Sequence, residues 1–120
     1  LKNYKKVISK RNQLSRIYFK ELKNLHDIKL FKLDNKNLTV YHQFVIRLEK
    51  RDQLKKFLEK NKIQTMIHYP YMLNELPFFG FKRTLNKSKN LGKKILSLPI
   101  SEEHSSEEIK YVANKIKSFF

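Results

Sequence analysis

The chain has 120 residues, about the length of one domain with a single modest core. Its 40% apolar and 12% aromatic content argues against a disordered tail, and its lack of cysteine excludes a disulfide framework and a thiolate ligand or nucleophile. The formal net charge of +16 makes nucleic acid a candidate partner, and the distribution of the basic residues along the chain decides how strong this candidate is.

The first predicted element is a long amphipathic helix over residues 4–25. Basic residues separate apolar residues that recur at spacings near three and four. The apolar positions are Tyr4, Val7, Leu14, Tyr18, Leu22 and Leu25. The opening residues lack the apolar stretch of a secretory signal, and no apolar run approaches the roughly 18 residues that span a bilayer. We therefore expect a cytoplasmic protein, and the first residue, Leu1, fits either a domain cut from a longer product or a processed chain.

Two strands are predicted next, over residues 28–33 and 39–48, with turn chemistry at residues 34–37. In the second strand, alternation places His42 in the same row as Phe44, Ile46 and Leu48. A histidine in such a row is typically buried and hydrogen-bonded. Arg47 lies on the opposite face and suits either a bound anion or an ion pair with a neighbouring helix.

In the second half of the chain, the sequence pattern predicts a helix over residues 51–61, a strand over residues 63–67 and a helix over residues 86–96. Arg51 and Asp52 mark the start of the first of these helices, and Leu98 with Pro99 ends the later one. Leu91 and Ile95 are expected to point inward.

The last helix has a readable start, because Ser105 and Glu108 have the spacing of a capping box. Its expected buried stripe is Ile109, Val112, Ala113, Ile116 and Phe119. The paired acidic residues around this start suit a helix N-terminus, so we do not interpret them as an acid/base pair. The predicted fold is one α+β domain, residues 1–120, with a small sheet of about three strands covered by helices.

The basic residues do not form the pattern of a nucleic-acid site. Lysines make up 22 of the 27 and are spread over almost every segment. The chain has no glycine-rich loop, no zinc-ligand spacing and no basic stripe interleaved with aromatic residues, and His26 and His104 have no partner at metal-ligand spacing. We expect no nucleic-acid partner, and a basic nucleic-acid-binding domain remains the weaker alternative.

The triplet His68, Tyr69 and Pro70 follows the predicted strand at residues 63–67. Proline favours an extended Tyr69, which would hold the strand end rigid and aim His68 and Tyr69 in opposite directions. Such a rigid end is suited to presenting an imidazole and a phenol to a ligand. A core histidine beside a packing tyrosine is the structural alternative, and these residues alone favour it, because a lone histidine beside a proline is a weak signal.

Four strings in order give the chain a resemblance to a known family. They read RNQLSRIYFKEL, VYHQFVIR, RDQLKKFLEKNKIQTMIHYP and KNLGKKILSLPIS. Their order and spacing resemble the C-terminal domain of the DegT/DnrJ/EryC1/StrS family of pyridoxal-phosphate-dependent aminotransferases, which act on nucleotide-linked keto sugars. The resemblance covers nearly the whole chain and implies the C-terminal small domain of a fold-type I enzyme.

In such enzymes this domain closes over the active site, and its His-Tyr-Pro segment borders the nucleotide-sugar pocket. The resemblance therefore implies substrate-binding roles for His68, Tyr69, Tyr71 and Asn74. It implies a full-length homodimer that takes an amino group from glutamate, through pyridoxal 5'-phosphate, to a 3- or 4-keto deoxysugar for surface polysaccharide or lipopolysaccharide synthesis. The cofactor-binding lysine and the aspartate that pairs with the pyridinium nitrogen would lie upstream, so we expect this chain alone neither to bind the cofactor nor to catalyse.

The sequence departs from the family pattern at a few positions. Met72 and Asn74 stand where relatives often have proline and histidine, which affects the sugar and the ring carbon that the pocket accepts. Asn86 stands where a proline commonly begins the next helix, and Lys62 stands where a glycine is expected. A stand-alone binding or regulatory module of the same fold is the alternative function, and it predicts a polar surface where an enzyme domain would expose an apolar docking face.

Overall fold

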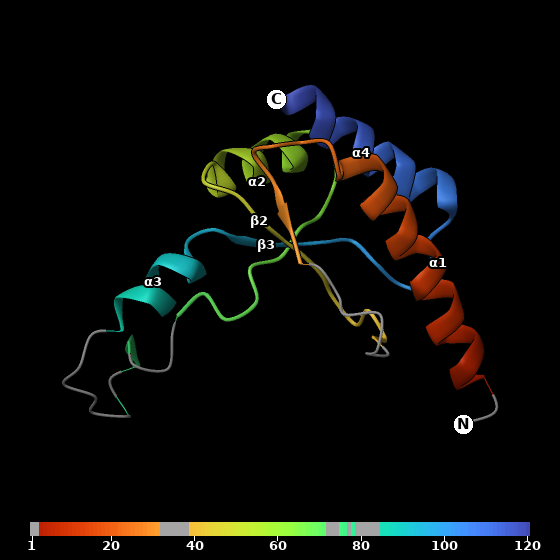
Figure 1. Ribbon diagram of the computed structural model, residues 1–120, viewed down its shortest axis with the longest axis horizontal. Helices are drawn as coiled ribbons and strands as arrows, with labels where there is room; N and C mark the ends of the chain where they lie inside the picture. Colours follow the sequence, from red (N-terminus) through yellow and green to blue (C-terminus); the bar gives the residue numbers. More distant parts are fainter. Residues whose placement is uncertain (1–2, 32–38, 72–74, 77, 79–84) are drawn as a thin grey trace.

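The computed structural model describes residues 3–31, 39–71, 75–76, 78 and 85–120. In chain order the elements are α1 (Tyr4–Leu22), β1 (Lys29–Leu30), β2 (Phe44–Arg47), α2 (Arg51–Lys60), α3 (Asn86–Gly92), β3 (Ile95–Leu98) and α4 (Ser106–Phe119). Figure 1 shows α1 and α4 side by side, β2 and β3 in the middle of the view and α3 set apart at the opposite end. In the described part of the chain, no helix combines the length and apolar content needed to cross a bilayer.

The sheet is antiparallel and has the order β1-β2-β3. Phe44 pairs with Leu98 and Ile46 with Leu96, and all four side chains are buried on the face that the helices cover. The core that they enter also takes Leu14, Tyr18 and Leu22 from α1, Leu54 and Leu58 from α2, and Ile109, Val112, Ala113 and Ile116 from α4. The predicted α+β fold with a three-stranded sheet under helices is confirmed.

The amphipathic helices form where the apolar spacing predicts them. Leu14, Tyr18 and Leu22 follow one another at intervals of four and lie on one face of α1, which ends at Leu22 and not at Leu25. At the start of α4, the Glu108 N–H donates to Ser105 Oγ at 3.1 Å, and the Ser105 N–H donates to Glu108 Oε2 at 2.7 Å. The predicted capping box is therefore confirmed. Of the five residues expected in the buried stripe of α4, four are buried and Phe119 is only partly buried.

The third strand is not the predicted one. Residues 63–67 form a single bridge, in which the N–H and C=O of Met66 pair with those of Ser97. Residues 95–98, predicted to end a helix, form β3 instead, and Leu91 is exposed and does not point inward. Pairing with β2 buries Leu96 and Leu98, which a continued α3 would not do, and this burial outweighs the local helical pattern. Gly92, the last residue of α3, was the available stop signal.

The second predicted strand is shorter than expected. It begins at Phe44, because Tyr41 has a φ of 46° and interrupts the alternation before that point. His42 is consequently exposed, so the expected burial of this histidine is wrong. Residues 32–33 of the first predicted strand and the turn at residues 34–37 lie outside the described residues.

The backbone at the end of α2 explains why the family pattern has a glycine where this chain has Lys62. The Lys62 N–H donates to the Glu59 carbonyl at 2.9 Å, and the Ile63 N–H donates to the Leu58 carbonyl at 2.9 Å. These are the two hydrogen bonds of a Schellman motif, whose left-handed residue is usually glycine. Here that residue is Lys62, with a φ of 60°.

Arg51 confirms the predicted start of α2 and connects this helix to the turn before β3. Its Nη1 donates to the carbonyls of Ile95 at 3.2 Å and Gly92 at 3.4 Å, and the residue is buried. Its Nε lies 2.6 Å from the Asp52 carboxylate, an electrostatic contact without hydrogen-bond geometry. The buried guanidinium therefore has a structural role in joining two segments.

Candidate functional site

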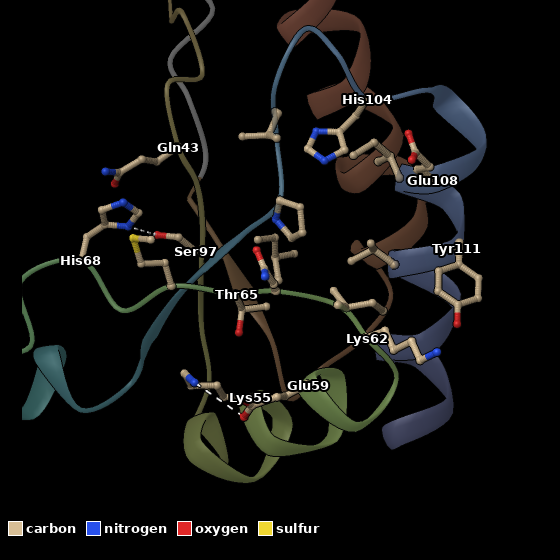
Figure 2. Close-up of a pocket in the computed structure, with 18 of the residues that line it drawn as sticks. Gln43, Lys55, Glu59, Lys62, Thr65, His68, Ser97, His104, Glu108 and Tyr111 are labelled. Atoms are coloured by element: carbon tan, nitrogen blue, oxygen red, sulfur yellow. Dashed lines mark hydrogen bonds and ion pairs between the residues drawn. The ribbon is translucent and has the colours of Figure 1, made fainter.

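The described structure has a groove of about 750 Å³. It is lined by α2, residues 62–66, His68, the end of β3 with the residues that follow it, and the first turns of α4. Figure 2 shows His68 and Ser97 at one end of the groove and Lys62 and Tyr111 at the other. A volume of this order is within the range of ligand pockets.

His68 is the predicted site residue that lies in this groove. It is half-buried, and its Nδ1 lies 2.8 Å from Ser97 Oγ in a hydrogen bond (Figure 2). Ser97 is in β3, with its side chain on the sheet face opposite the core residues Leu96 and Leu98. The imidazole is thus attached to the face of the sheet that carries no core residues.

Tyr69 and Tyr71 lie outside the groove lining. Tyr69 is 79% exposed and Tyr71 is 68% exposed. Tyr69 has a φ of 59°, so the extended geometry expected before Pro70 is wrong, and the chain turns sharply after His68. Asn74 lies outside the described residues, and the substrate roles of these positions remain predictions.

Sequence reasoning missed Ser97 as a site residue. A serine in an apolar strand has no chemical signature of its own, and its partner His68 is 29 residues away in the chain. Two other histidines line the groove, namely His42 and His104. His104 Nδ1 lies 3.0 Å from Ser101 Oγ, in the turn that leads into α4. Among the described residues no three potential ligands form a metal site.

The lysines and carboxylates that line the groove do not form the set that pyridoxal phosphate requires. That cofactor needs a lysine for its Schiff base and a charged partner for its pyridinium nitrogen. Lys55 lies 3.9 Å from the Glu59 carboxylate, and Lys62 is exposed at the end of α2. The Glu108 carboxylate caps α4, and the Ser105 backbone N–H that donates to it lowers the pKa of Glu108. We therefore assign no described residue to the cofactor.

Arg47 belongs to a separate, smaller cavity of about 250 Å³ that His26 and Asp27 also line. His42 lines the large groove, so the two residues do not share a site, as their opposite faces predict. The described residues form no ion pair with Arg47.

A third cavity, of about 360 Å³, is lined almost entirely by apolar side chains. Val45 and Ile95 come from the sheet face that also bears Ser97, and they are half-buried. Phe31 is 49% exposed and Leu91 is 40% exposed beside them. We call these four residues the apolar face.

Comparisons with known proteins agree with the resemblance. The chain is 40% identical over 85 residues to a pleiotropic regulatory protein of Geobacillus stearothermophilus, an alignment that covers 68% of this chain and 23% of that protein. It is 27% identical over 112 residues to the dTDP-3-amino-3,6-dideoxy-alpha-D-galactopyranose transaminase of Aneurinibacillus thermoaerophilus, with 92% and 31% covered. The chain therefore spans about a quarter to a third of the length of these relatives.

The fold is similar to that of solved sugar aminotransferases. The crystal structure of DesV from S. venezuelae superimposes with a TM-score of 0.93 at 24% identity, covering 99% of this chain and 33% of that one. The family model for DegT/DnrJ/EryC1/StrS aminotransferases matches residues 1–117. Because this match extends over nearly the whole sequence, the chain belongs to the DegT/DnrJ/EryC1/StrS aminotransferase family.

Proposed function

We propose that this chain is the C-terminal small domain of a pyridoxal-phosphate-dependent nucleotide-sugar aminotransferase. The full-length protein transfers an amino group from glutamate to a 3- or 4-keto deoxysugar linked to a nucleoside diphosphate. The observation that carries the proposal is the family match over residues 1–117, together with relatives whose names describe sugar transaminases. Pyridoxal phosphate, when bound, supplies the carrier chemistry for the amino group.

In this proposal the domain supplies one wall of the substrate pocket. His68 is held on the sheet face opposite the core residues Leu96 and Leu98, and its ring provides a polar group for a nucleotide sugar. Tyr69 and Tyr71, exposed just after it, are available to contact the same substrate from the pocket rim. Asn74 completes the proposed set. The cofactor lysine and its neighbours are placed in the part of the protein upstream of this chain.

The apolar face supports a domain within a larger enzyme over a stand-alone module. Phe31, Val45, Leu91 and Ile95 lie together on the sheet side that bears Ser97 and His68. An apolar patch of this kind is typical of a docking surface, and the relatives are about three times as long as this chain, so they have residues to cover it. We propose that the large domain of the same chain docks here, which places His68 at the boundary between domains.

The remaining parts of the proposal follow from the family. The full-length enzyme is a homodimer of the cytoplasm that feeds surface polysaccharide or lipopolysaccharide synthesis. The intact mass of the gene product from its native cell tests the domain assignment. A mass well over twice the 14.6 kDa of this chain supports it. A mass near 14.6 kDa contradicts it and favours the binding or regulatory module.

The substrate site is tested by the double variant His68→Ala/Tyr69→Ala in the full-length protein. Titration with dTDP- and UDP-linked 3-amino and 4-amino deoxysugars gives the affinity, and the visible absorbance of the bound cofactor reports on the rest of the active site. We expect the affinity to fall by about tenfold or more, the loss of one or two hydrogen bonds, with unchanged absorbance.

Tyr4→Ala is the matched control for loss of an exposed tyrosine, because Tyr4 lies at the start of α1, away from the groove. Unchanged sugar affinity in the double variant would overturn the site. Duplex DNA titrated at low and high salt tests the remaining alternative, since specific binding by clustered lysines would weaken steeply with salt.

A further inference from the structure

Ser97 is the one polar residue of β3, between Leu96 and Leu98. It is 7% exposed, and its backbone is fully used in the bridge to Met66, with its N–H donating to the Met66 carbonyl at 2.9 Å and its C=O accepting from the Met66 N–H at 3.1 Å. Among the described residues, the single hydrogen-bond partner of its hydroxyl is His68 Nδ1 at 2.8 Å. A buried polar side chain at this position therefore has one partner, and that partner is the proposed substrate-binding histidine.

A second serine and histidine pair in the same molecule shows what a purely local role looks like. Ser101 Oγ lies 3.0 Å from His104 Nδ1, three residues later, and it also accepts a hydrogen bond from the Glu103 N–H at 3.2 Å. These contacts stabilise the turn that leads into α4. The pair of Ser97 and His68 is different, because it joins two segments that are 29 residues apart and stabilises no turn.

The low exposure of Ser97, 7%, favours one direction for this hydrogen bond. A serine hydroxyl carries one proton to donate, and a buried donor without an acceptor is costly. If Ser97 Oγ only accepted from a protonated Nδ1, its own proton would have no acceptor among the described residues. Donation from Ser97 Oγ to Nδ1 satisfies the hydroxyl and leaves the proton of the neutral imidazole on Nε2.

We propose that Ser97 is a positioning residue that holds His68 in the Nε2–H tautomer and orients this N–H as a donor to an oxygen of the nucleotide sugar. A nucleotide sugar suits this arrangement, because its diphosphate and sugar oxygens accept hydrogen bonds. The positive φ of Tyr69, 59°, turns the chain away directly after His68, so the contact with Ser97 fixes the ring where the backbone leaves the sheet. The inference rests on the proposed substrate role of His68.

The test compares Ser97→Ala with Ser97→Thr in the full-length protein, by titration with the amino-sugar nucleotide of the panel above that the unmodified protein binds best. Ser97→Ala removes one hydrogen bond, so we expect its affinity to fall roughly three- to tenfold. Ser97→Thr keeps the hydroxyl, so we expect its affinity to stay within about twofold of that of the unmodified protein. A role of Ser97 in packing alone would not predict this difference between the two variants. Ser101→Ala is the matched control, and it should leave the affinity unchanged although it also removes a hydroxyl from a histidine.

The ring nitrogens of His68 provide a readout that does not depend on sugar binding. In protein labelled with nitrogen-15 at histidine, we expect the His68 Nδ1 shift to be that of an unprotonated nitrogen and the Nε2 shift to be that of a protonated one. Ser97→Ala should shift these signals toward a mixture of tautomers, and Ser101→Ala should not. A predominant Nδ1–H tautomer in the unmodified protein would overturn the inference.

A double-mutant cycle separates the failure of this inference from the failure of the proposed function. If His68 binds the sugar through the arrangement that Ser97 sets, Ser97→Ala has no further effect in a His68→Ala background. If His68→Ala lowers the affinity and Ser97→Ala does not, the positioning role is wrong and the proposed substrate site stands. If neither change alters the affinity, the proposed substrate site is wrong.

Discussion

Replacing Lys62 by glycine is expected to stabilise the protein, although most substitutions destabilise a folded chain. Lys62 is the exposed residue that ends α2 in a left-handed conformation, with a φ of 60°. A residue with a Cβ pays about 1–2 kcal/mol in this conformation, and glycine does not. Glycine loses more backbone entropy on folding, which offsets about 0.5–1 kcal/mol. The net expectation for Lys62→Gly is a gain of about 0.5–1 kcal/mol in the free energy of unfolding.

The same substitution two residues earlier should have the opposite sign. Lys60 is also exposed, but it lies within α2 and has helical geometry. Lys60→Gly is therefore expected to lower the free energy of unfolding by up to about 1 kcal/mol, the penalty of glycine in a helix interior, because Lys60 is the last residue of α2. Lys62→Ala removes the charge and keeps the Cβ, so it shows whether any gain at position 62 comes from the backbone or from the loss of one positive charge.

Urea unfolding followed by circular dichroism at 222 nm measures all three variants against the unmodified protein. The reasoning is refuted if Lys62→Gly destabilises the protein as Lys60→Gly does. It is also refuted if Lys62→Ala gives the same gain as Lys62→Gly, because the gain would then belong to the charge.

Two further changes test the core and the surface electrostatics. Tyr18 is fully buried and donates its hydroxyl to the Pro99 carbonyl at 2.8 Å, so Tyr18→Phe should lower the free energy of unfolding by about 1–2 kcal/mol in a urea titration, and no loss would contradict a role for this bond. The hydrogen bond and charge of Lys117 lower the pKa of the Glu21 carboxyl from its ordinary 4.5, so this carboxylate binds a proton less readily in the folded state than in the unfolded state. This stabilisation is present above pH 4.5 and is lost as the pH falls through the lowered pKa, so the stability difference between Glu21→Gln and the unmodified protein should shrink from pH 7 to pH 3. A difference that stays constant over this range would contradict the assignment.

Local patterns were enough wherever the interactions are close in sequence. The spacing of Leu14, Tyr18 and Leu22 predicts α1, because residues four apart lie on the same face of a helix. The capping box of α4 needs only Ser105 and Glu108, three residues apart, and it forms as predicted. The order of four short motifs was enough to indicate the family, which the match over residues 1–117 bears out.

Within the candidate site, the sequence indicated His68 but not the residue that holds it. The expected extended Tyr69 rested on Pro70 alone, which restricts the preceding residue only weakly compared with the surrounding structure. The expected burial of His42 rested on an alternation that Tyr41 interrupts. In each case a neighbour in the chain suggested a geometry that the folded backbone does not adopt.

The sequence by itself determined the amphipathic helices, the cap of α4 and the family, because each depends on residues at fixed short spacings. The tertiary structure alone decided that residues 95–98 form a strand, since pairing with β2 buries Leu96 and Leu98 in the core. It also decided that Ser97 meets His68, across 29 residues of chain. Both outcomes depend on contacts between segments that are distant in the chain, and local sequence patterns do not predict the free energy of such contacts.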